Sequence, residues 1–262
     1  MITMKGAAVS AKLKEQVEKG LETLTWVPKL TIIRVGENPD DISYEKGATK
    51  KLTSFGLEVE SKVFPGDISD EAFKREFAAI NADASVDGIL MLRPLPKQIN
   101  EQDIEKMIDP AKDLDGISPV NIAKVFSGDT SGFAPCTAEA VVCMLKMNDI
   151  ALSGKRVAVV GRSMVVGRPL SMLLLHENAT VTICHSRSEN LPEICREADI
   201  LVVAAGKAGM VGAESVREGQ VVLDVGIHVG ADGNLCGDTR FAEVEPIVEA
   251  ITPVPGGVGT VT

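Results

Sequence analysis

A turn that follows the apolar run at 156–160 is the first place where the residue types suggest chemistry. Gly161, Ser163 and Gly167 follow this run and precede an apolar helical pattern. A strand that turns tightly into a helix N-terminus presents backbone N–H groups to a diphosphate, and glycines permit such a turn. The spacing is G-x-S-x-x-x-G rather than the fingerprint G-x-G-x-x-G, so an ordinary β-α turn is the alternative. We predict a phosphate loop here.

The residues after the next predicted strand indicate which dinucleotide binds. An acidic residue at that point would accept hydrogen bonds from the adenosine ribose and mark NAD. This chain instead has Ser186 and Arg187 after Cys184. A hydroxyl and an arginine suit a 2′-phosphate, and Arg162 lies on the phosphate loop just above. We therefore predict NADP as the cofactor, the alternative being that both arginines are solvated surface charges.

Both halves of the chain alternate short β-rich apolar runs with amphipathic helical segments. We expect two α/β domains, the second a doubly wound Rossmann-type dinucleotide-binding domain. Residues 1–136 are expected to form the first domain and residues 137–247 the nucleotide domain. Residues 248–262 are expected to return to the first domain.

Apolar periodicity and turn residues give the expected elements. In the first half, strands are expected at 30–35, 57–63 and 88–92, helices at 10–24, 41–55, 70–82 and from 100, and a loop at 112–121. A helix at 136–147, with Thr137 as its N-cap, joins the two halves. In the second half, strands are expected at 156–160, 180–184, 200–205 and 221–225, helices at 169–177 and 191–198, and a tight turn at Asp232-Gly233.

Composition excludes several classes of partner. The chain has 262 residues and a net charge of −10, which repels phosphate backbones and anionic lipids. We therefore expect a small-molecule ligand rather than nucleic acid or a membrane. The five cysteines form no C-x-x-C pair and the three histidines show no metal-ligand spacing, so we expect neither a disulfide framework nor a metal. With no apolar run long enough to span a bilayer and no signal-peptide core, a cytoplasmic location is expected.

Short motifs follow one another in order along nearly the whole chain. They are VGENP (35–39), Tyr44, GIL with PLP (88–96), KDLDG (112–116), PCT (135–137), VVGRS (159–163), VGRP (166–169), CHS (184–186), DVGI (224–227) and TPVPGGVG (252–259). Together they resemble the methylenetetrahydrofolate dehydrogenase/cyclohydrolase family, called FolD in bacteria. The resemblance implies a folate site between two α/β domains, hydride transfer to NADP, a tetrahydrofolate one-carbon derivative as substrate, and a homodimer through the nucleotide domain.

The resemblance also implies roles for individual residues. It assigns Tyr44 to stacking on the pterin ring and Asp115 to bonding the polar edge of that ring. Taken alone, Tyr44 fits core packing and Asp115 fits a turn cap. The substrate site is expected to include Ala48, Leu92, Pro253, Gly256 and Gly257. The nucleotide contacts map onto Gly161, Arg162, Ser163, Ser186 and Ile227, with Ile227 beside the nicotinamide, and the residue patterns add Gly167 and Arg187.

The folate side departs from the family pattern at two polar positions. Members with both activities carry Tyr-x-x-x-Lys, and a glutamine in Gly-Ile-Leu-x-Gln-Leu-Pro-Leu-Pro. Here these positions are Ala48 and Leu92, with Arg93 where leucine is usual. Lys46 and Lys50 point about 200° away from position 48 on a helix, so neither is an obvious substitute. Arg93 follows Leu92 on a predicted strand, where neighbouring side chains face opposite sides.

The two reactions of the family make different demands. Hydride transfer depends on holding two rings in contact, whereas hydrolysis of the methenyl cation needs a positioned acid or base. We therefore predict an NADP-dependent dehydrogenase whose cyclohydrolase activity is weak or absent. The nearest alternative is a fully bifunctional enzyme in which Arg93, Lys50 or ordered water replaces the lysine. Further alternatives are a catalytically silent folate- and nucleotide-binding protein and another oxidoreductase with a Rossmann domain. A smaller departure is Gly226-Ile227-His228, where the family has Gly-Ile-Asn.

Overall fold

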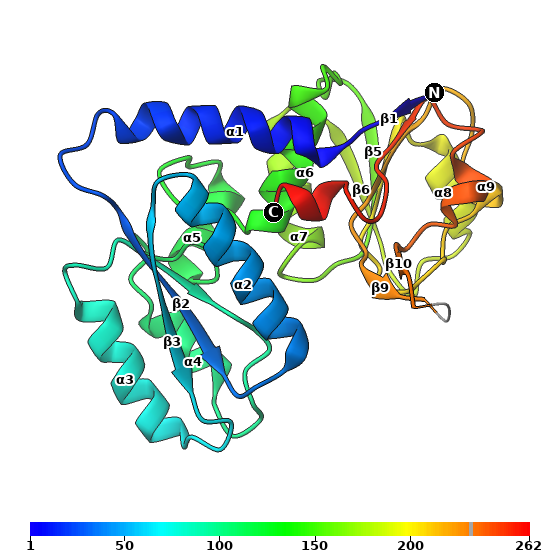
Figure 1. The fold of residues 1–262 in the computed structure, drawn as a ribbon. Coiled ribbons are helices and arrows are strands. Elements are labelled where there is room, and N and C mark those ends of the chain that lie inside the picture. The colour runs from blue at the N-terminus through cyan, green and yellow to red at the C-terminus, as the bar shows by residue number, and fades with distance from the viewer. Residues whose placement is uncertain (231–232) are drawn as a thin grey trace. The chain divides into compact units, whose positions relative to one another are not determined.

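The computed structural model describes residues 1–230 and 233–262, which fall into two compact units. Unit 1 comprises Met1–Lys12 and Pro135–Thr262, and unit 2 comprises Leu13–Ala134. Each unit has its own parallel sheet and its own helices (Figure 1). Each also has its own hydrophobic core. The expectation of two α/β domains is therefore confirmed.

The unit boundaries differ from the expected ones at both ends of the chain. The two-residue strand β1 (Ile2–Thr3) pairs in parallel with β11 (Ala250–Ile251). Residues 1–12 and 248–262 therefore lie in unit 1, not in the domain expected at 1–136. Strands of two residues are too short to show an alternating pattern, so this pairing has no local signature in the sequence.

Unit 2, all of whose residues are described, consists of three parallel strands with their connecting helices. The strands are β2 (Lys29–Val35), β3 (Glu58–Phe64) and β4 (Gly88–Met91), and the helices are α2 (Pro39–Ser54), α3 (Asp70–Ala82), α4 (Glu101–Met107) and α5 (Pro119–Ser127). The central strand is β2, paired with both others. Its Ile33 belongs to one core cluster with Phe73 and Phe77, the two buried residues of α3.

Helix α5 was not expected, because its first residues fall inside the predicted loop at 112–121. The Ser118 side chain caps this helix by accepting a hydrogen bond from Asn121 N at 3.1 Å, and Pro119 occupies its first position. Gly128, at φ +78°, ends it. Ser-Pro at the start and glycine after the end are recognised helix boundaries, so the sequence did contain this signal.

Helix α1 (Gly6–Leu21) begins four residues before its expected start at Ser10. Its first residue is held in unit 1, where Gly6 N donates to Gly256 O at 2.8 Å. A Cβ on Gly6 would lie 2.3 Å from Gly257 O, so the close approach needs glycine. The earlier start therefore depends on the contact between Gly6 and Gly256, which are 250 positions apart in the chain. Local sequence patterns cannot predict such a contact.

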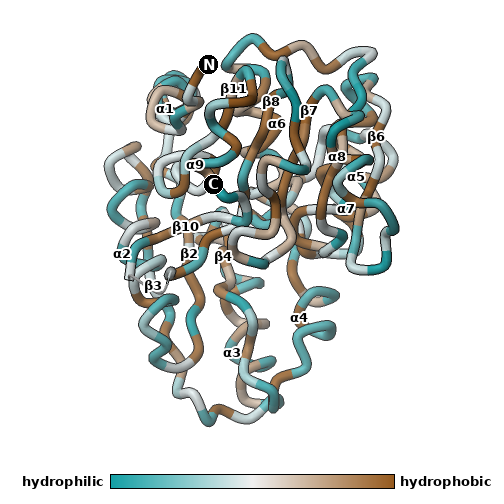
Figure 2. The backbone as a smooth tube through the Cα atoms, turned by 90° about the vertical axis from the view of Figure 1, so that its right-hand side faces the viewer, coloured by the Kyte–Doolittle hydropathy of each residue, from teal (hydrophilic) through white to brown (hydrophobic). Residues whose placement is uncertain are grey.

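Among its described residues, unit 1 holds a six-stranded parallel sheet. Its order is β1, β11, β8 (Val221–Asp224), β7 (Ile200–Val203), β5 (Arg156–Val160) and β6 (Thr180–Cys184). The strand order reverses at β5, because β6 pairs with one edge of β5 and β7 with the other. Ligands of open α/β sheets bind outside the carboxyl ends of the strands at such a switch point. Figure 2 shows β7 and β8 in hydrophobic colours, as expected for strands covered on both faces.

The remaining elements of unit 1 surround this sheet. They are α6 (Cys136–Met147), α7 (Gly167–His176), α8 (Leu191–Glu197), α9 (Phe241–Val244), two 3-10 turns (Ala213–Ser215 and Val258–Thr260) and the antiparallel pair β9 (His228–Val229) and β10 (Leu235–Cys236). The N-cap of α6 is Pro135, so the expectation that Thr137 caps it is wrong: Thr137 already lies inside the helix. Asp232 of the expected Asp232-Gly233 turn lies outside the described residues. No helix in the described parts of the chain is both long and apolar enough to cross a bilayer.

Candidate active site

The predicted phosphate loop of unit 1 is built by close backbone approach. Gly161 follows β5 at φ +136°, and a Cβ on it would lie 2.1 Å from Ala204 O. A Cβ on Gly167 would lie 2.1 Å from Gly161 O. Only glycine fits at both positions, for the reason that the sequence suggested. Helix α7 begins at Gly167 without a side-chain cap, which leaves its N-terminus suited to a diphosphate.

The cationic and hydroxyl groups predicted to contact the nucleotide lie on the surface near the ends of β5 and β6. Arg162, Ser163, Ser186 and Arg187 are all exposed. Within the described residues, neither arginine belongs to an ion pair. The turn after β6 is closed by His185, whose N donates to Ser188 Oγ at 2.9 Å. Two uncompensated guanidinium groups and no carboxylate at the end of β6 fit a 2′-phosphate better than a free ribose.

The segment PVPGGVG also belongs to unit 1 and reaches Ile227. A Cβ on Gly257 would lie 2.4 Å from Pro253 O, and Gly256 has φ +98°, so the turn requires its glycines. A Cβ on Gly259 would lie 3.0 Å from Ile227 Cδ1. Ile227 itself is 58% exposed. The structure therefore brings the predicted nicotinamide neighbour together with one end of the PVPGGVG segment.

Sequence reasoning missed two buried carboxylates in this region, those of Asp224 and Asp238. Asp224 accepts hydrogen bonds from Gly226 N, Asp238 N and Thr239 N. The distance from Asp238 N to Asp224 Oδ1 is 2.9 Å. Burial raises the pKa of Asp224, and the hydrogen bonds from Thr239 and from Asp238 N partly offset the increase. A Cβ on Gly237 would lie 2.0 Å from Asp224 Oδ2. The glycines next to each aspartate, in DVG and GDT, were the available signal for such close packing.

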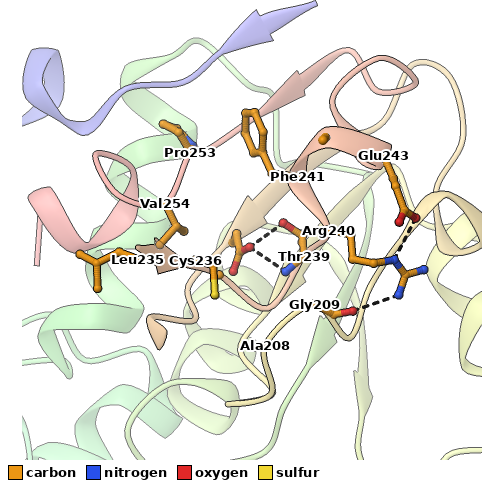
Figure 3. A pocket seen from close by; sticks show the side chains of 13 residues that line it. Ala208, Gly209, Leu235, Cys236, Thr239, Arg240, Phe241, Glu243, Pro253 and Val254 are labelled. Atoms are coloured by element: carbon orange, nitrogen blue, oxygen red, sulfur yellow. Dashed lines mark hydrogen bonds and ion pairs between the residues drawn. The ribbon is translucent and has the colours of Figure 1, made fainter. Parts of the chain in front are cut away.

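A cavity of about 580 Å³ opens beside Asp224. Figure 3 shows two bonds from Thr239 and the bond from Arg240 to Glu243. Thr239 N donates to Asp224 Oδ2 at 2.8 Å, and Arg240 Nε donates to Glu243 Oε2 at 2.8 Å. The polar groups of this wall are thus paired with one another. The lining includes Pro253 but not the loop at 161–167, so this cavity is separate from the predicted phosphate site.

In unit 2, the predicted pterin-stacking residue lies on α2. Tyr44 is 47% exposed, and Ala48 is half-buried one helical turn later. Lys46 and Lys50 are exposed, in keeping with the helical rotation argued from the sequence. Lys51, which sequence reasoning did not consider, is half-buried, and burial lowers the pKa of its ammonium.

Arg93 lies against Asp115, the residue predicted to bond the pterin edge. Its Nη2 is 3.3 Å from Asp115 Oδ2, and its Nη1 is 3.3 Å from Glu101 Oε1 and 3.6 Å from Glu105 Oε1. Burial raises the pKa of Glu105, and the charge of Arg93 opposes this effect. Strand β4 ends at Met91, so Arg93 lies beyond the strand. The expectation that Leu92 and Arg93 face opposite sides of a strand therefore does not apply.

The loop that carries Asp115 is fixed by a buried neighbour. Asp113 is fully buried and accepts hydrogen bonds from Ile117 N at 3.0 Å and Ser118 N at 2.8 Å. Asn121 Nδ2 donates to the same carboxylate at 2.9 Å. Asp115 itself keeps a side chain that is 23% exposed. The motif KDLDG thus contains one aspartate that shapes the loop and one that stays accessible.

The described residues contain no group of three or more His, Cys, Asp or Glu side chains placed to hold a metal ion. The acidic cluster around Arg93 is neutralised in part by that arginine.

Comparison with known proteins matches both units to one family. The family model for the tetrahydrofolate dehydrogenase/cyclohydrolase catalytic domain matches residues 4–115, and the model for the NAD(P)-binding domain of the same family matches residues 135–262. A curated relative, the "Bifunctional protein FolD" of Carboxydothermus hydrogenoformans, is 50% identical over 98% of this chain and 91% of its own length.

Solved structures agree with this match. The bifunctional FolD methylenetetrahydrofolate dehydrogenase/cyclohydrolase of Campylobacter jejuni has a TM-score of 0.96 at 37% identity, covering 100% of this chain and 94% of its own. The methylenetetrahydrofolate dehydrogenase-cyclohydrolase of Trypanosoma brucei, described as complexed with NADP cofactor and inhibitor, has a TM-score of 0.92 at 32% identity, covering 100% and 93%. Because both family models match and a relative is 50% identical over nearly the whole chain, this chain belongs to the tetrahydrofolate dehydrogenase/cyclohydrolase family.

Proposed function

We propose that the protein is an NADP-dependent 5,10-methylenetetrahydrofolate dehydrogenase, which yields 5,10-methenyltetrahydrofolate. The observation that carries this proposal is the loop at 161–167. Backbone packing admits only glycine at positions 161 and 167, and the exposed Arg162 and Arg187 flank the predicted phosphate positions. The nicotinamide would accept the hydride from the folate methylene carbon. Residues of this chain would bind and orient both ligands, since this reaction depends chiefly on holding the rings in contact.

On the folate side, we propose that Tyr44 stacks on the face of the pterin ring and that Asp115 forms hydrogen bonds with its polar edge. The exposed ring of Tyr44 leaves a face for stacking. Asp115 keeps an accessible carboxylate on a loop that Asp113 holds rigid. A rigid loop lowers the entropy cost of ordering the carboxylate when substrate binds. The same proposal includes a homodimer and a cytoplasmic location.

Cyclohydrolase activity is the second candidate function. The prediction that it is weak or absent depends on Ala48 and Leu92, and the relatives do not support it. The Campylobacter jejuni and Trypanosoma brucei proteins are named as dehydrogenase and cyclohydrolase, and the Carboxydothermus hydrogenoformans relative is named as bifunctional. The bifunctional alternative fits these names better. It requires another group of this chain to take the place of the missing lysine, either as the positive charge beside the folate or as the acid or base for hydrolysis.

Two cationic side chains of unit 2 favour the bifunctional alternative. Arg93 contacts Asp115, as described above. Lys51 follows Tyr44 by seven residues and Ala48 by three, so the three share one side of α2. Helical side chains lean toward the N-terminus of their helix, so the stem of Lys51 lies over the turn that holds Ala48. The lowered pKa of Lys51 brings its proton transfer closer to neutral pH.

Assays of both reactions with the purified protein test the proposal. We expect reduction of NADP in preference to NAD when 5,10-methylenetetrahydrofolate is supplied. Binding of both ligands without cofactor reduction would instead indicate the catalytically silent protein.

Hydrolysis of methenyltetrahydrofolate above the spontaneous rate decides between the other two alternatives. In a bifunctional enzyme, Lys51→Met or Arg93→Leu should lower hydrolysis by about 10²-fold or more, whereas the matched surface variant Lys46→Met should not. In an enzyme that lacks the activity, the double variant Ala48→Lys with Leu92→Gln should raise hydrolysis by about 10²–10⁴-fold. A wild type that hydrolyses rapidly and gains nothing from the double variant refutes the prediction of weak activity.

A further inference from the structure

The carboxylate of Asp238 joins segments at the carboxyl ends of the central strands of unit 1. Its side chain is fully buried. It accepts hydrogen bonds from three consecutive backbone N–H groups after β7, and His228 Nε2 lies 2.7 Å from its Oδ1. The three donors are Ala205 N at 2.6 Å, Gly206 N at 3.0 Å and Lys207 N at 2.8 Å.

The three N–H groups form an anion-binding nest. Gly206 has φ +66°, the left-handed conformation that turns successive N–H groups toward one point. Such nests commonly hold phosphate, but Asp238 occupies this one from within the chain. A diphosphate is therefore directed to the other backbone site, the loop at 161–167.

The segment that Asp238 holds also supports that loop. Ala204 N donates to Val160 O at 2.8 Å, and Ala204 O lies 2.1 Å from the position of a Cβ on Gly161. A shift of the residues after β7 would therefore move the wall against which Gly161 packs. Asp238 thus fixes one side of the predicted phosphate loop.

Asp238 fixes the residues on both sides of Ile227 as well. A Cβ on Gly226 would lie 2.3 Å from Asp238 Cγ, so the backbone before Ile227 rests on the carboxylate. His228, directly after Ile227, is bonded to it. One buried side chain therefore sets the position of Ile227 and that of the segment beside Gly161.

We propose that Asp238 and His228 are positioning residues for the dinucleotide. They set the separation between the phosphate loop and Ile227, and so determine whether diphosphate and nicotinamide are held at the same time. His228 Nε2 lies within hydrogen-bond distance of Asp238 Oδ1, at 2.7 Å. This inference rests on the proposed NADP-dependent function, and neither residue is assigned to contact the ligand.

Calorimetric titration of the full chain with NADP tests the inference directly. Asp238→Asn keeps the size of the side chain but turns an NH2 group against N–H donors, and we expect the Kd for NADP to rise by about tenfold or more. The matched control is Asp199→Asn at the amino ends of the strands, where Asp199 accepts a hydrogen bond from Arg156 N at 2.9 Å. It should lower the thermal unfolding temperature without changing the Kd for NADP.

A pair of changes at His228 keeps the test decisive if Asp238→Asn does not fold. His228→Asn can still donate to Asp238 and should keep the Kd for NADP within about twofold, whereas His228→Ala should weaken binding and leave the KM for folate unchanged. If the wild type binds NADP and all four variants bind it with the same Kd, the inference is overturned and the proposed function is not. A wild type that binds neither NADP nor NAD overturns the proposed function, and the inference with it.

Discussion

The nucleotide side and the folate side of this protein are built by different means. In unit 1, the predicted site consists mainly of backbone packed so closely that Gly161 and Gly167 admit no side chain. In unit 2, it consists of side chains, and two of the polar ones usual in the family are replaced by Ala48 and Leu92. A backbone-built site tolerates little change because every substitution clashes. A side-chain-built site can be rearranged, here with Arg93 among three carboxylates.

The largest effect is expected for Gly161→Ala in unit 1. The new Cβ would lie 2.1 Å from Ala204 O, at a positive φ of +136°. Such a clash must move the phosphate loop, so the Kd for NADP should rise by about 10²-fold or more. The matched control is Gly154→Ala, which also has a positive φ, +75°, but meets nothing within 4 Å. Similar NADP affinity in the two variants would contradict a backbone-built site.

A moderate effect is expected for Tyr44→Ala in unit 2. Removing the ring that is proposed to stack on the pterin should raise the KM for methylenetetrahydrofolate by about tenfold, given the usual energy of an aromatic pair and its buried area. Tyr44→Phe retains the ring and serves as the control. The Kd for NADP should be the same in both variants. An unchanged KM for folate in Tyr44→Ala would show that Tyr44 does not stack on the pterin ring.

The smallest effect concerns two carboxyl groups, one in each unit. Burial raises the pKa of Glu139 in unit 1 and that of Glu105 in unit 2 above the usual value of 4.5, but Arg93 opposes the shift only at Glu105. A raised folded-state pKa means that the folded protein binds the proton more tightly, so this contribution to stability is present at low pH and is lost as the pH rises through the folded pKa. We expect Glu139→Gln to raise the unfolding temperature at pH 7 and to leave it unchanged near pH 4.

Glu105→Gln sharpens the same comparison. It removes the cost of burying a charge but also removes a partner of Arg93, so its gain in unfolding temperature at pH 7 should be smaller than that of Glu139→Gln. Thermal unfolding followed by circular dichroism between pH 4 and pH 8 measures both. A larger gain for Glu105→Gln would show that Arg93 does not compensate the charge of Glu105.

Most of the secondary structure followed from local patterns, because strands such as β5 are continuous apolar runs and α3 shows a clear helical face. The unexpected parts depend on distant contacts. Strand β1 exists only by pairing with β11, and α1 starts early because Gly6 meets Gly256. Helix α5 is different, since Ser118-Pro119 is a helix start that the local sequence does indicate.

For the candidate site, the sequence by itself determined the family and the residue types: glycines after β5, arginines for a 2′-phosphate, and the missing lysine and glutamine. Only the tertiary structure decided which of these side chains have partners. It placed Arg93 on Asp115, and it closed a backbone nest with Asp238, about thirty residues away in the chain. The reason is physical: glycine requirements are local and leave a mark in the sequence, whereas a buried carboxylate is defined by donors that only folding brings to it.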